Sequence, residues 1–262
     1  MTDQAPRVVY RDADLLVLDK PSGLPTTSPD GRDCLASWAR AHDPDAPRMH
    51  PSSRLDAEVT GLVTFARTPR AIQQLMAARA ASQYRRFYLG VAARAPEPLA
   101  GEWRFPIARD PRDARKRRAL PEGAKVREAA GVPPAAAKDG TVCLADAAWT
   151  RYRTLWSGAQ AALLLLQPET GRTHQLRVHA AYVGAPLWGD KHYGGPTRGV
   201  HADGRVFAAR RVLLHCAQLI LPGIAQPEPL RLHAPVPADL REFFGQLGGD
   251  AALLEPDAWG GR

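Results

Sequence analysis

A short apolar, partly β-branched run at residues 62–66 most constrains how this chain can fold, because a charged loop leads directly into it. Its length and composition predict a buried strand. Arg54 and Asp56 lie on the preceding loop, and Gly61 separates that loop from the strand. A charged pair at the mouth of a buried strand is costly to desolvate unless it is paired or used in chemistry. Arg54 and Asp56 therefore form either a simple surface ion pair or part of a site.

Further apolar patterns predict several strands and four helices along the chain. Strands are expected at residues 8–10, 15–18, 84–92, 149–155, 161–166 and 212–221. Helices are expected at residues 34–42, from 69 onward, from about 170 to 184, and at 237–247. Asp33 is a candidate cap for the first of these helices, and Thr170 or Thr173 for the third. The helix that starts at Pro69 is expected to bury an apolar face of Ile72, Leu75 and Met76.

The chain carries a net charge of +8, and most of it is concentrated in one segment. Residues 104–127 contain nine Lys or Arg against three acids, with Arg-Lys-Arg-Arg at 115–118. Such a block suits a polyanionic partner, although a solvated basic loop is an alternative. Periodicity is lost from residue 96 to 140, which predicts a basic insertion whose 121–140 part is mobile.

Cysteine spacing and hydropathy exclude several other classes of protein. Three distant cysteines without a CxxC pair favour reduced thiols in the cytoplasm over a disulfide frame or zinc ribbon. No apolar run reaches the roughly 18 residues of a membrane span, and the N-terminus lacks a signal-peptide core. His174 and His179 are five residues apart, which does not suit metal ligands on one helical face, so we expect them at the helix surface or behind a site.

The third predicted helix begins with a polar cluster that includes Arg172, His174, Gln175 and Arg177. Backbone N–H groups and the helix dipole favour an anion at this end. Two arginines there are suited to a phosphate or a carboxylate.

Three segments occur in an order that is familiar from one enzyme family. They are Arg-Leu-Asp at 54–56 with Thr-Gly-Leu at 60–62, Arg-Phe-Tyr-Leu at 86–89, and Gly-Arg-Thr-His-Gln-Leu-Arg-Val-His at 171–179, which is followed by a Gly-Asp-x-x-Tyr-Gly motif at 189–194. They resemble the H-R-L-D-x-x-T-S-G-L, K-x-Y-L and G-R-T-H-Q-L-R-x-H…G-D-x-x-Y-G boxes of pseudouridine synthases of the RluA type. Ser53, Val59 and Arg86 depart from these boxes. The likeness extends over residues 8–236.

The resemblance implies an RNA pseudouridine synthase that isomerises specific uridines in rRNA or tRNA without a metal or cofactor. Asp56 would be the catalytic carboxylate, which either attacks the sugar or abstracts a sugar proton. Arg172 would pair with Asp56 and hold it ionised. Tyr88 would stack on the uracil and could help with the proton leaving carbon 5. Arg54 would fill the space left by a flipped uridine.

Weaker expectations concern residues that would contact RNA or shape the pocket. Lys20 is expected to bind phosphate or to support a loop, and Leu214 to pack against the pocket. Arg86 stands at the basic position of the second box and is expected to contact substrate. Arg177 would hold the RNA backbone together with the 104–127 block.

The fold implied by the resemblance is α+β: a long, bent, mainly antiparallel sheet flanked by helices, with a central RNA-binding cleft. One catalytic domain is expected over residues 1–248, without an N-terminal RNA-binding module of the S4 type, followed by a loose tail at 249–262. The protein is expected to be a cytoplasmic monomer that binds no membrane. A non-catalytic RNA-binding or chaperone protein on the same fold is the main alternative, and a metal-assisted hydrolase is disfavoured by the lack of a ligand cluster.

Overall fold

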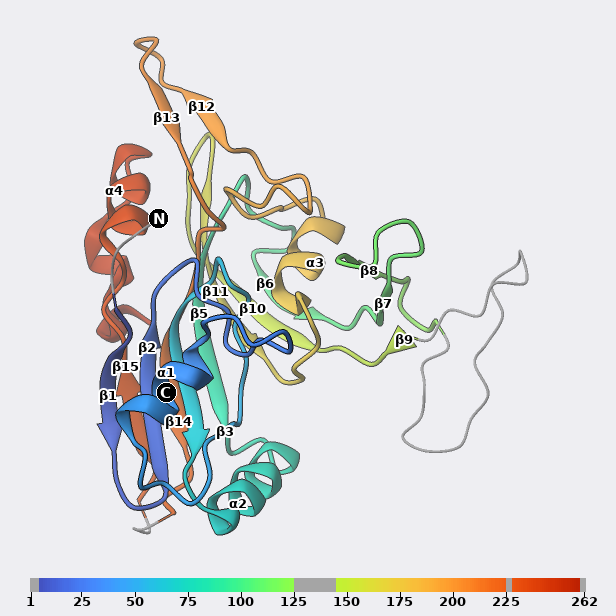
Figure 1. Ribbon diagram of the computed structural model, residues 1–262. Helices are drawn as coiled ribbons and strands as arrows, with labels where there is room; N and C mark the ends of the chain where they lie inside the picture. Colours follow the sequence, from blue (N-terminus) through green and yellow to red (C-terminus); the bar gives the residue numbers. More distant parts are fainter. Residues whose placement is uncertain (1–4, 125–144, 225–227, 260–262) are drawn as a thin grey trace. The chain divides into compact units, whose positions relative to one another are not determined.

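The structure is a computed structural model that describes residues 5–124, 145–224 and 228–259 (Figure 1). The chain divides into two compact units. Unit 1 comprises Met1–Leu89 and Arg211–Arg262, and unit 2 comprises Gly90–Arg210. The expectation of one domain over residues 1–248 stays a prediction. The segment expected to be mobile, 121–140, lies outside the described residues except for its first four positions.

The expected α+β fold is confirmed, because a large, mixed and mostly antiparallel sheet is accompanied by four α-helices in the described part of the chain. Unit 1 contains β1 Arg7–Arg11, β2 Leu15–Lys20, β3 His50–Pro51, β4 Thr60–Ala66, β14 Leu214–Leu221, β15 Leu230–His233 and the start of β5 Arg85–Ala92. Its helices are α1 Leu35–His42, α2 Pro69–Ala80 and α4 Ala238–Gln246.

The core of unit 1 is built on strands that are apolar along their whole length. Strands run in the order β1-β2-β4-β14-β5, with β3 paired to β4 and β15 to β14. Every residue of β4 and β14 is buried, as continuous apolar runs predict for strands covered on both faces. These two strands pair in parallel through His215 with Thr60 and Cys216 with Gly61, so the loop before β4 enters at a fixed point of the sheet.

The N-terminal caps of α1 and α2, and the buried face of α2, can be compared with the predictions. Cys34, and not Asp33, caps α1: its thiol accepts a hydrogen bond from the Ser37 N–H, and the Ser37 hydroxyl accepts one from the Cys34 N–H. The prediction of Asp33 was wrong because the helix begins one residue later than that cap requires. Thr68 caps α2 and Pro69 occupies its first turn. Met76 was expected to be buried, but it is 67% exposed, because α2 buries its face through Ala71, Leu75 and Ala78.

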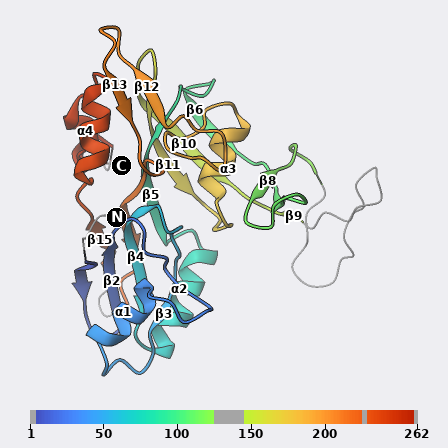
Figure 2. The ribbon, with the colours of Figure 1, turned by 45° about the horizontal axis from the view of Figure 1, so that its top comes forward.

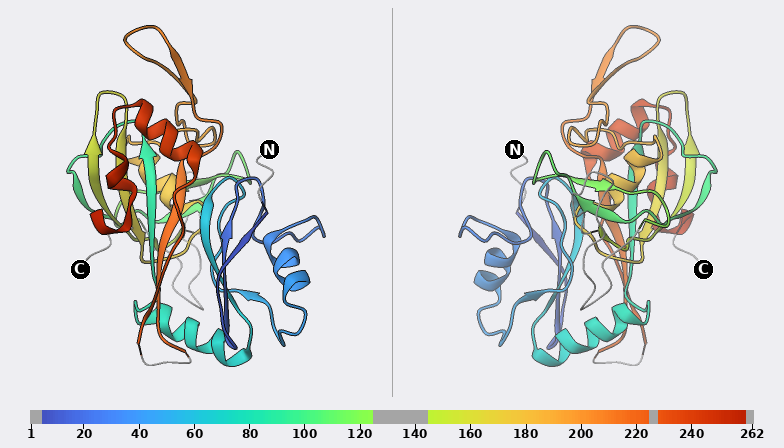
Figure 3. Two further views of the ribbon diagram at one scale, coloured as in Figure 1. Left: turned by 90° about the vertical axis from the view of Figure 1, so that its left-hand side faces the viewer. Right: turned by 90° about the vertical axis from the view of Figure 1, so that its right-hand side faces the viewer.

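Helix α2 lies across the end of the unit 1 sheet near the connection between β14 and β15 (Figure 3). Arg70 at its start donates a hydrogen bond to the Ile224 carbonyl over 3.3 Å.

The C-terminal tail differs from the loose segment that was expected. It forms two short 3₁₀ turns, η1 Ala251–Leu254 and η2 Pro256–Ala258, and it buries Leu254 and Trp259.

Within its described residues, unit 2 combines an antiparallel sheet with two smaller sheets and one α-helix. Its elements are β6 Ala100–Trp103, β7 Ile107–Arg109, β8 Arg117–Ala119, β9 Ala145–Asp146, β10 Thr150–Ser157, β11 Ala162–Pro168, α3 Gln175–Tyr182, β12 Arg198–Val200 and β13 Val206–Ala208. Strands β11, β10 and β6 pair antiparallel in that order, and β7 pairs with β8 and β9. The insertion expected at 96–140 is therefore partly regular, with three short strands.

Helix α3 lies beside β8 in unit 2 (Figure 2). Val178 from α3 packs with Ile107 of β7 and Ala148, and Tyr193 covers this cluster. The helix begins at His174 in the left-handed conformation, with φ of 57° and no side-chain cap. The expected caps, Thr170 and Thr173, were wrong because this backbone conformation places the first turn after both threonines.

Gly61 is the position where β4 and β14 come closest. Its φ is +107°, and a Cβ added there would lie 2.3 Å from the carbonyl oxygen of Cys216. We predict that Gly61→Ala lowers the free energy of unfolding by about 2–4 kcal/mol, because it adds a backbone clash to a strained φ. Urea unfolding followed by circular dichroism measures this. Gly204→Ala is the matched control, since it shares a positive φ but meets nothing within 4 Å; an equal loss in both variants would contradict the prediction.

Candidate active site

The loop before β4 presents one carboxylate and one guanidinium to solvent. Asp56 is partly exposed and Arg54 is exposed, whereas the intervening Leu55 is buried. The Val59 N–H donates to the Asp56 backbone carbonyl over 3.1 Å, which closes a tight turn into the strand. The buried Leu55 therefore anchors the loop between the exposed Arg54 and the partly exposed Asp56.

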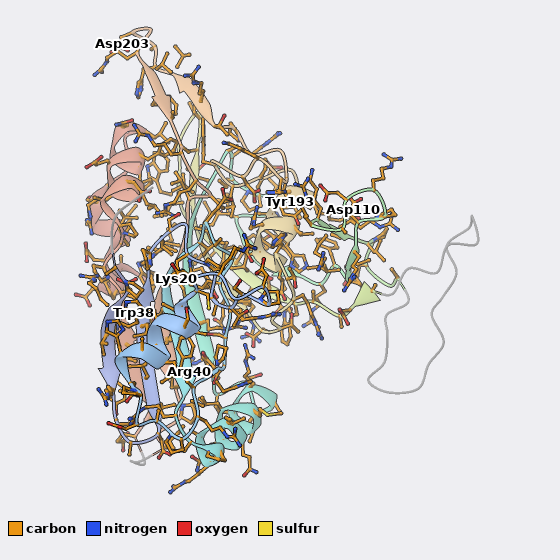
Figure 4. The ribbon with its side chains drawn as sticks, viewed as in Figure 1. Lys20, Trp38, Arg40, Asp110, Tyr193 and Asp203 are labelled. Atoms are coloured by element: carbon orange, nitrogen blue, oxygen red, sulfur yellow. The ribbon has the colours of Figure 1, made fainter. Side chains whose placement is uncertain are left out.

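Lys20 ties this loop to the rest of unit 1. Its side chain is fully buried, and its Nζ donates to three carbonyl oxygens: Pro21 at 2.9 Å, Leu24 at 2.7 Å and Ala57 at 3.0 Å. Burial lowers the pKa of Lys20 to about 7, against the opposing attraction of the Asp56 carboxylate. Lys20 lies inside unit 1 (Figure 4), so its geometry fits the loop-support role and not the phosphate contact that was also expected.

Four more hydrogen bonds hold the same loop, and no sequence pattern predicts them. The Thr26 hydroxyl donates to the Leu55 carbonyl and accepts from the Leu55 N–H, both over 2.9 Å. The Ser22 hydroxyl donates to the Glu58 carbonyl over 3.1 Å, and the Gly23 N–H donates to Ala57 over 2.8 Å. Lone Ser and Thr residues are common in loops, and only the folded chain brings these two beside residues 55–58.

Tyr88 and Arg86 lie two residues apart on β5 and so share one face of the strand. Both side chains are buried, with 4% of Tyr88 and 6% of Arg86 exposed. Burial, followed by the neighbouring Cys216 thiol, raises the pKa of Tyr88 well above its ordinary value. The phenol therefore stays neutral at physiological pH.

Leu214 begins β14 and is buried, and its expected place against a pocket stays a prediction. The Thr60 hydroxyl lies 3.5 Å from the Leu214 carbonyl and 2.9 Å from Nδ1 of His215. Burial lowers the pKa of His215 to about 4, so its imidazole is neutral. This polar contact joins β4 to β14 at the strand end that carries the Asp56 loop.

Arg172 in unit 2 precedes α3 and is exposed. Its Nε donates to the Ala147 carbonyl over 2.9 Å, and its Nη1 lies 4.0 Å from the Asp146 carboxylate. The guanidinium is thus held on one side while it remains accessible to solvent.

Arg177 was expected to bind the RNA backbone, but its side chain is buried in an ion pair. Only 3% of its side chain is exposed, and it forms two hydrogen bonds of 2.7 and 2.8 Å with the fully buried carboxylate of Asp190. Its guanidinium also lies 5.2 Å from the centre of the Tyr193 ring. The side chain is committed to the interior of unit 2, because the helix face on which it lies packs against the 187–193 loop.

The two histidines of α3 lie in different environments. His179 is fully buried between Thr150 and the Phe105 carbonyl, which excludes the helix surface and leaves the other expected place, behind a site. Burial lowers the pKa of His179 to about 4. Nδ1 of His174 lies 2.6 Å from the Tyr193 hydroxyl, to which the Arg117 N–H also donates over 3.0 Å. Tyr193, which stands over α3 in Figure 4, therefore links the helix start to β8.

The described part of the basic block forms a hairpin of β7 and β8. Asp110 and Asp113 organise the turn between these strands by accepting backbone hydrogen bonds from Arg112 and Arg115. The Arg115 guanidinium also pairs with Asp113, which lowers the pKa of that carboxyl to about 2.

Within the described ranges, no cluster of three His, Cys, Asp or Glu side chains is placed so that it could hold a metal ion. No helix there is long and apolar enough to cross a membrane.

The buried pair in unit 2 generates a stability prediction. Asp190→Asn should lower the free energy of unfolding by about 3–5 kcal/mol, because it leaves the Arg177 charge buried without its counter-charge. Chemical denaturation of the purified protein measures the loss. Asp203→Asn breaks a solvent-exposed pair with Arg205 and should lower the free energy of unfolding far less. Equal effects of the two substitutions would show that burial of the pair does not matter.

Comparison with known proteins supports the same chemistry. A family model described as RNA pseudouridylate synthase matches residues 14–182. Ribosomal large subunit pseudouridine synthase D of Xanthomonas campestris is 33% identical over 259 residues, which cover 94% of this chain and 70% of that protein. An uncharacterized RNA pseudouridine synthase of Zymomonas mobilis is 30% identical over 93% of this chain and 98% of its own length.

Among solved structures, human RNA pseudouridylate synthase domain containing 4 superposes with a TM-score of 0.65 at 26% identity, covering 92% of both chains. The family model spans well over half of the chain, and both relatives are matched over more than two thirds of their own length. The chain therefore belongs to the RNA pseudouridine synthases of the RluA type, isomerases that convert uridine to pseudouridine in RNA.

Proposed function

We propose that the protein isomerises one or a few specific uridines of large-subunit rRNA, acting in the cytoplasm as a monomer without a metal or cofactor. The rRNA target rests on relatives that are named ribosomal large subunit pseudouridine synthase D. The observation that carries the enzymatic role is Asp56, a partly exposed carboxylate on a loop whose backbone is fastened from below by Lys20 and Thr26.

Asp56 is the proposed catalytic carboxylate. Uridine isomerisation breaks the N-glycosidic bond and rejoins the uracil through carbon 5, and an ionised carboxylate at the sugar either attacks it or removes a proton from it. Both roles require a negative charge at a fixed position. The buried Lys20 ammonium attracts that charge, and the hydrogen-bonded loop restricts its position.

Tyr88 is proposed to stack on the uracil ring. Its high pKa opposes the alternative in which a phenolate removes the carbon 5 proton. Arg172 is proposed as the ion-pair partner of Asp56, on the strength of its place in the family box and its accessible guanidinium. Arg54, which is exposed beside Asp56, is proposed to support base extrusion.

Basic side chains of the described 104–124 segment are proposed to bind the RNA backbone. Arg109, Arg112 and Arg115 are exposed there, which favours contact with phosphates and a salt-dependent affinity. Arg86 and Arg177 are buried and are not included.

We predict that Asp56→Ala reduces pseudouridine formation by about 10³-fold or more, because the reaction loses its only proposed carboxylate. The experiment maps pseudouridines in total RNA by carbodiimide-based primer extension. It compares a deletion strain complemented with wild-type protein, with Asp56→Ala, or with Asp45→Asn, which changes an exposed aspartate elsewhere in unit 1. One or a few large-subunit rRNA sites should be lost in the deletion and with Asp56→Ala, and restored by the other two proteins.

Other outcomes separate the parts of this proposal. If Asp56→Ala restores the sites, the protein is still the enzyme, but Asp56 is not its catalytic residue. Loss confined to tRNA would overturn the rRNA target. If no site changes, and purified wild-type protein binds transcripts but does not modify them, the non-catalytic RNA-binding alternative is correct.

A further inference from the structure

The turn from β11 to α3 carries Arg172 and has an unusual backbone. His174 adopts φ of 57°, a left-handed conformation that is unfavourable for a non-glycine residue. Such strain persists only where the surrounding contacts outweigh it. In this turn, several of these contacts are hydrogen bonds made by the side chain of the next residue, Gln175, to residues 170–172.

The Gln175 amide uses all of its hydrogen-bonding groups, and the side chain is 4% exposed. Its Oε1 accepts from the Arg172 backbone N–H over 3.0 Å and from the Thr170 hydroxyl over 2.7 Å. Its Nε2 donates to the Trp149 carbonyl over 2.9 Å and to the Thr150 hydroxyl over 3.0 Å. One buried amide thus joins the turn at 170–172 to the start of β10.

The strand end that receives these bonds is itself held in place. Two guanidiniums lie over the Trp149 ring, Arg104 at 4.2 Å and Arg151 at 4.9 Å from its centre. The Trp149 N–H donates to the Thr170 hydroxyl over 2.9 Å, so the turn and the strand are bonded in both directions.

We propose that Gln175 is a positioning residue for Arg172. The amide fixes the Arg172 backbone N–H, while the Ala147 carbonyl fixes Nε of the same residue, so the exposed end of the guanidinium can occupy only a narrow range of positions. The proposal rests on the proposed function, in which Arg172 acts at the reacting carboxylate. A displacement of about 1 Å of a catalytic group can cost roughly 10²-fold in rate. Loss of the amide should therefore act on turnover and not on RNA binding.

The test uses the full-length protein and two readouts. Hydrogen exchange at the Arg172 amide reports the position of the turn, and tritium release from [5-³H]uridine-labelled total RNA of the deletion strain reports turnover. Gln175→Leu removes all four hydrogen bonds at similar volume, and Thr170→Val removes one of them with minimal change of shape. Gln167→Leu is the matched control, because its amide bonds Glu169 near the turn without contacting Arg172.

Gln175→Leu is expected to accelerate Arg172 amide exchange and to lower kcat by about 10- to 100-fold with KM within about twofold of wild type. Thr170→Val should do the same to a smaller degree, and Gln167→Leu should do neither. In an Arg172→Lys background, Gln175→Leu should lower kcat by much less than it does in the wild type, because a positioning residue has no effect without the group it positions.

Two results would overturn the proposal: unchanged Arg172 exchange in Gln175→Leu and Thr170→Val, or an equal kcat loss from Gln175→Leu in both backgrounds. If wild-type protein releases no tritium, or if Arg172→Lys keeps full activity, the proposed function fails instead. In that case, hydrogen exchange at the Arg172 amide in Gln175→Leu alone shows whether Gln175 fixes the conformation of the turn.

Discussion

The buried ammonium of Lys20 is the interaction on which the candidate active site depends. A fully buried charge is unfavourable unless its hydrogen-bonding groups are satisfied, and here three carbonyls and a nearby carboxylate compensate it. These carbonyls belong to the loop after β2 and to the loop before β4. One side chain therefore fastens two loops together, and the position of Asp56 follows from backbone contacts below it.

A similar arrangement occurs in unit 2, with a neutral group in place of the charge. Arg172 is exposed, and the buried Gln175 amide holds its backbone. In the interior of the same unit, the Arg177–Asp190 ion pair joins α3 to the 187–193 loop. In both units an exposed ionic group suited to chemistry stands on a turn that buried polar side chains hold in place. Such support reduces the reorganisation needed when substrate binds.

Much of the fold could be predicted because it depends on local pattern, whereas the catalytic roles of the site residues stay predictions. The apolar run of β4, the hairpin of β1 and β2, and the paired β10 and β11 all follow the expected spacing. The local pattern left open whether Asp56 forms a surface ion pair or part of a site, and the resemblance alone indicated its catalytic role. The partners of Lys20 and Arg177 were not predictable, because Ala57 and Asp190 meet them only through the tertiary fold. The Cys34 cap was missed because thiols rarely serve as caps.

The most direct test of this account measures amide hydrogen exchange in Lys20→Met, with Lys191→Met, an exposed lysine, as the control. If Lys20 fastens the two loops, the amides of Gly23, Leu55 and Val59 should exchange at least about 10-fold faster in Lys20→Met, while those of β10 and β11 keep their protection. Unchanged exchange at those three amides in a folded Lys20→Met protein would show that Asp56 is held by other contacts, and it would contradict the account.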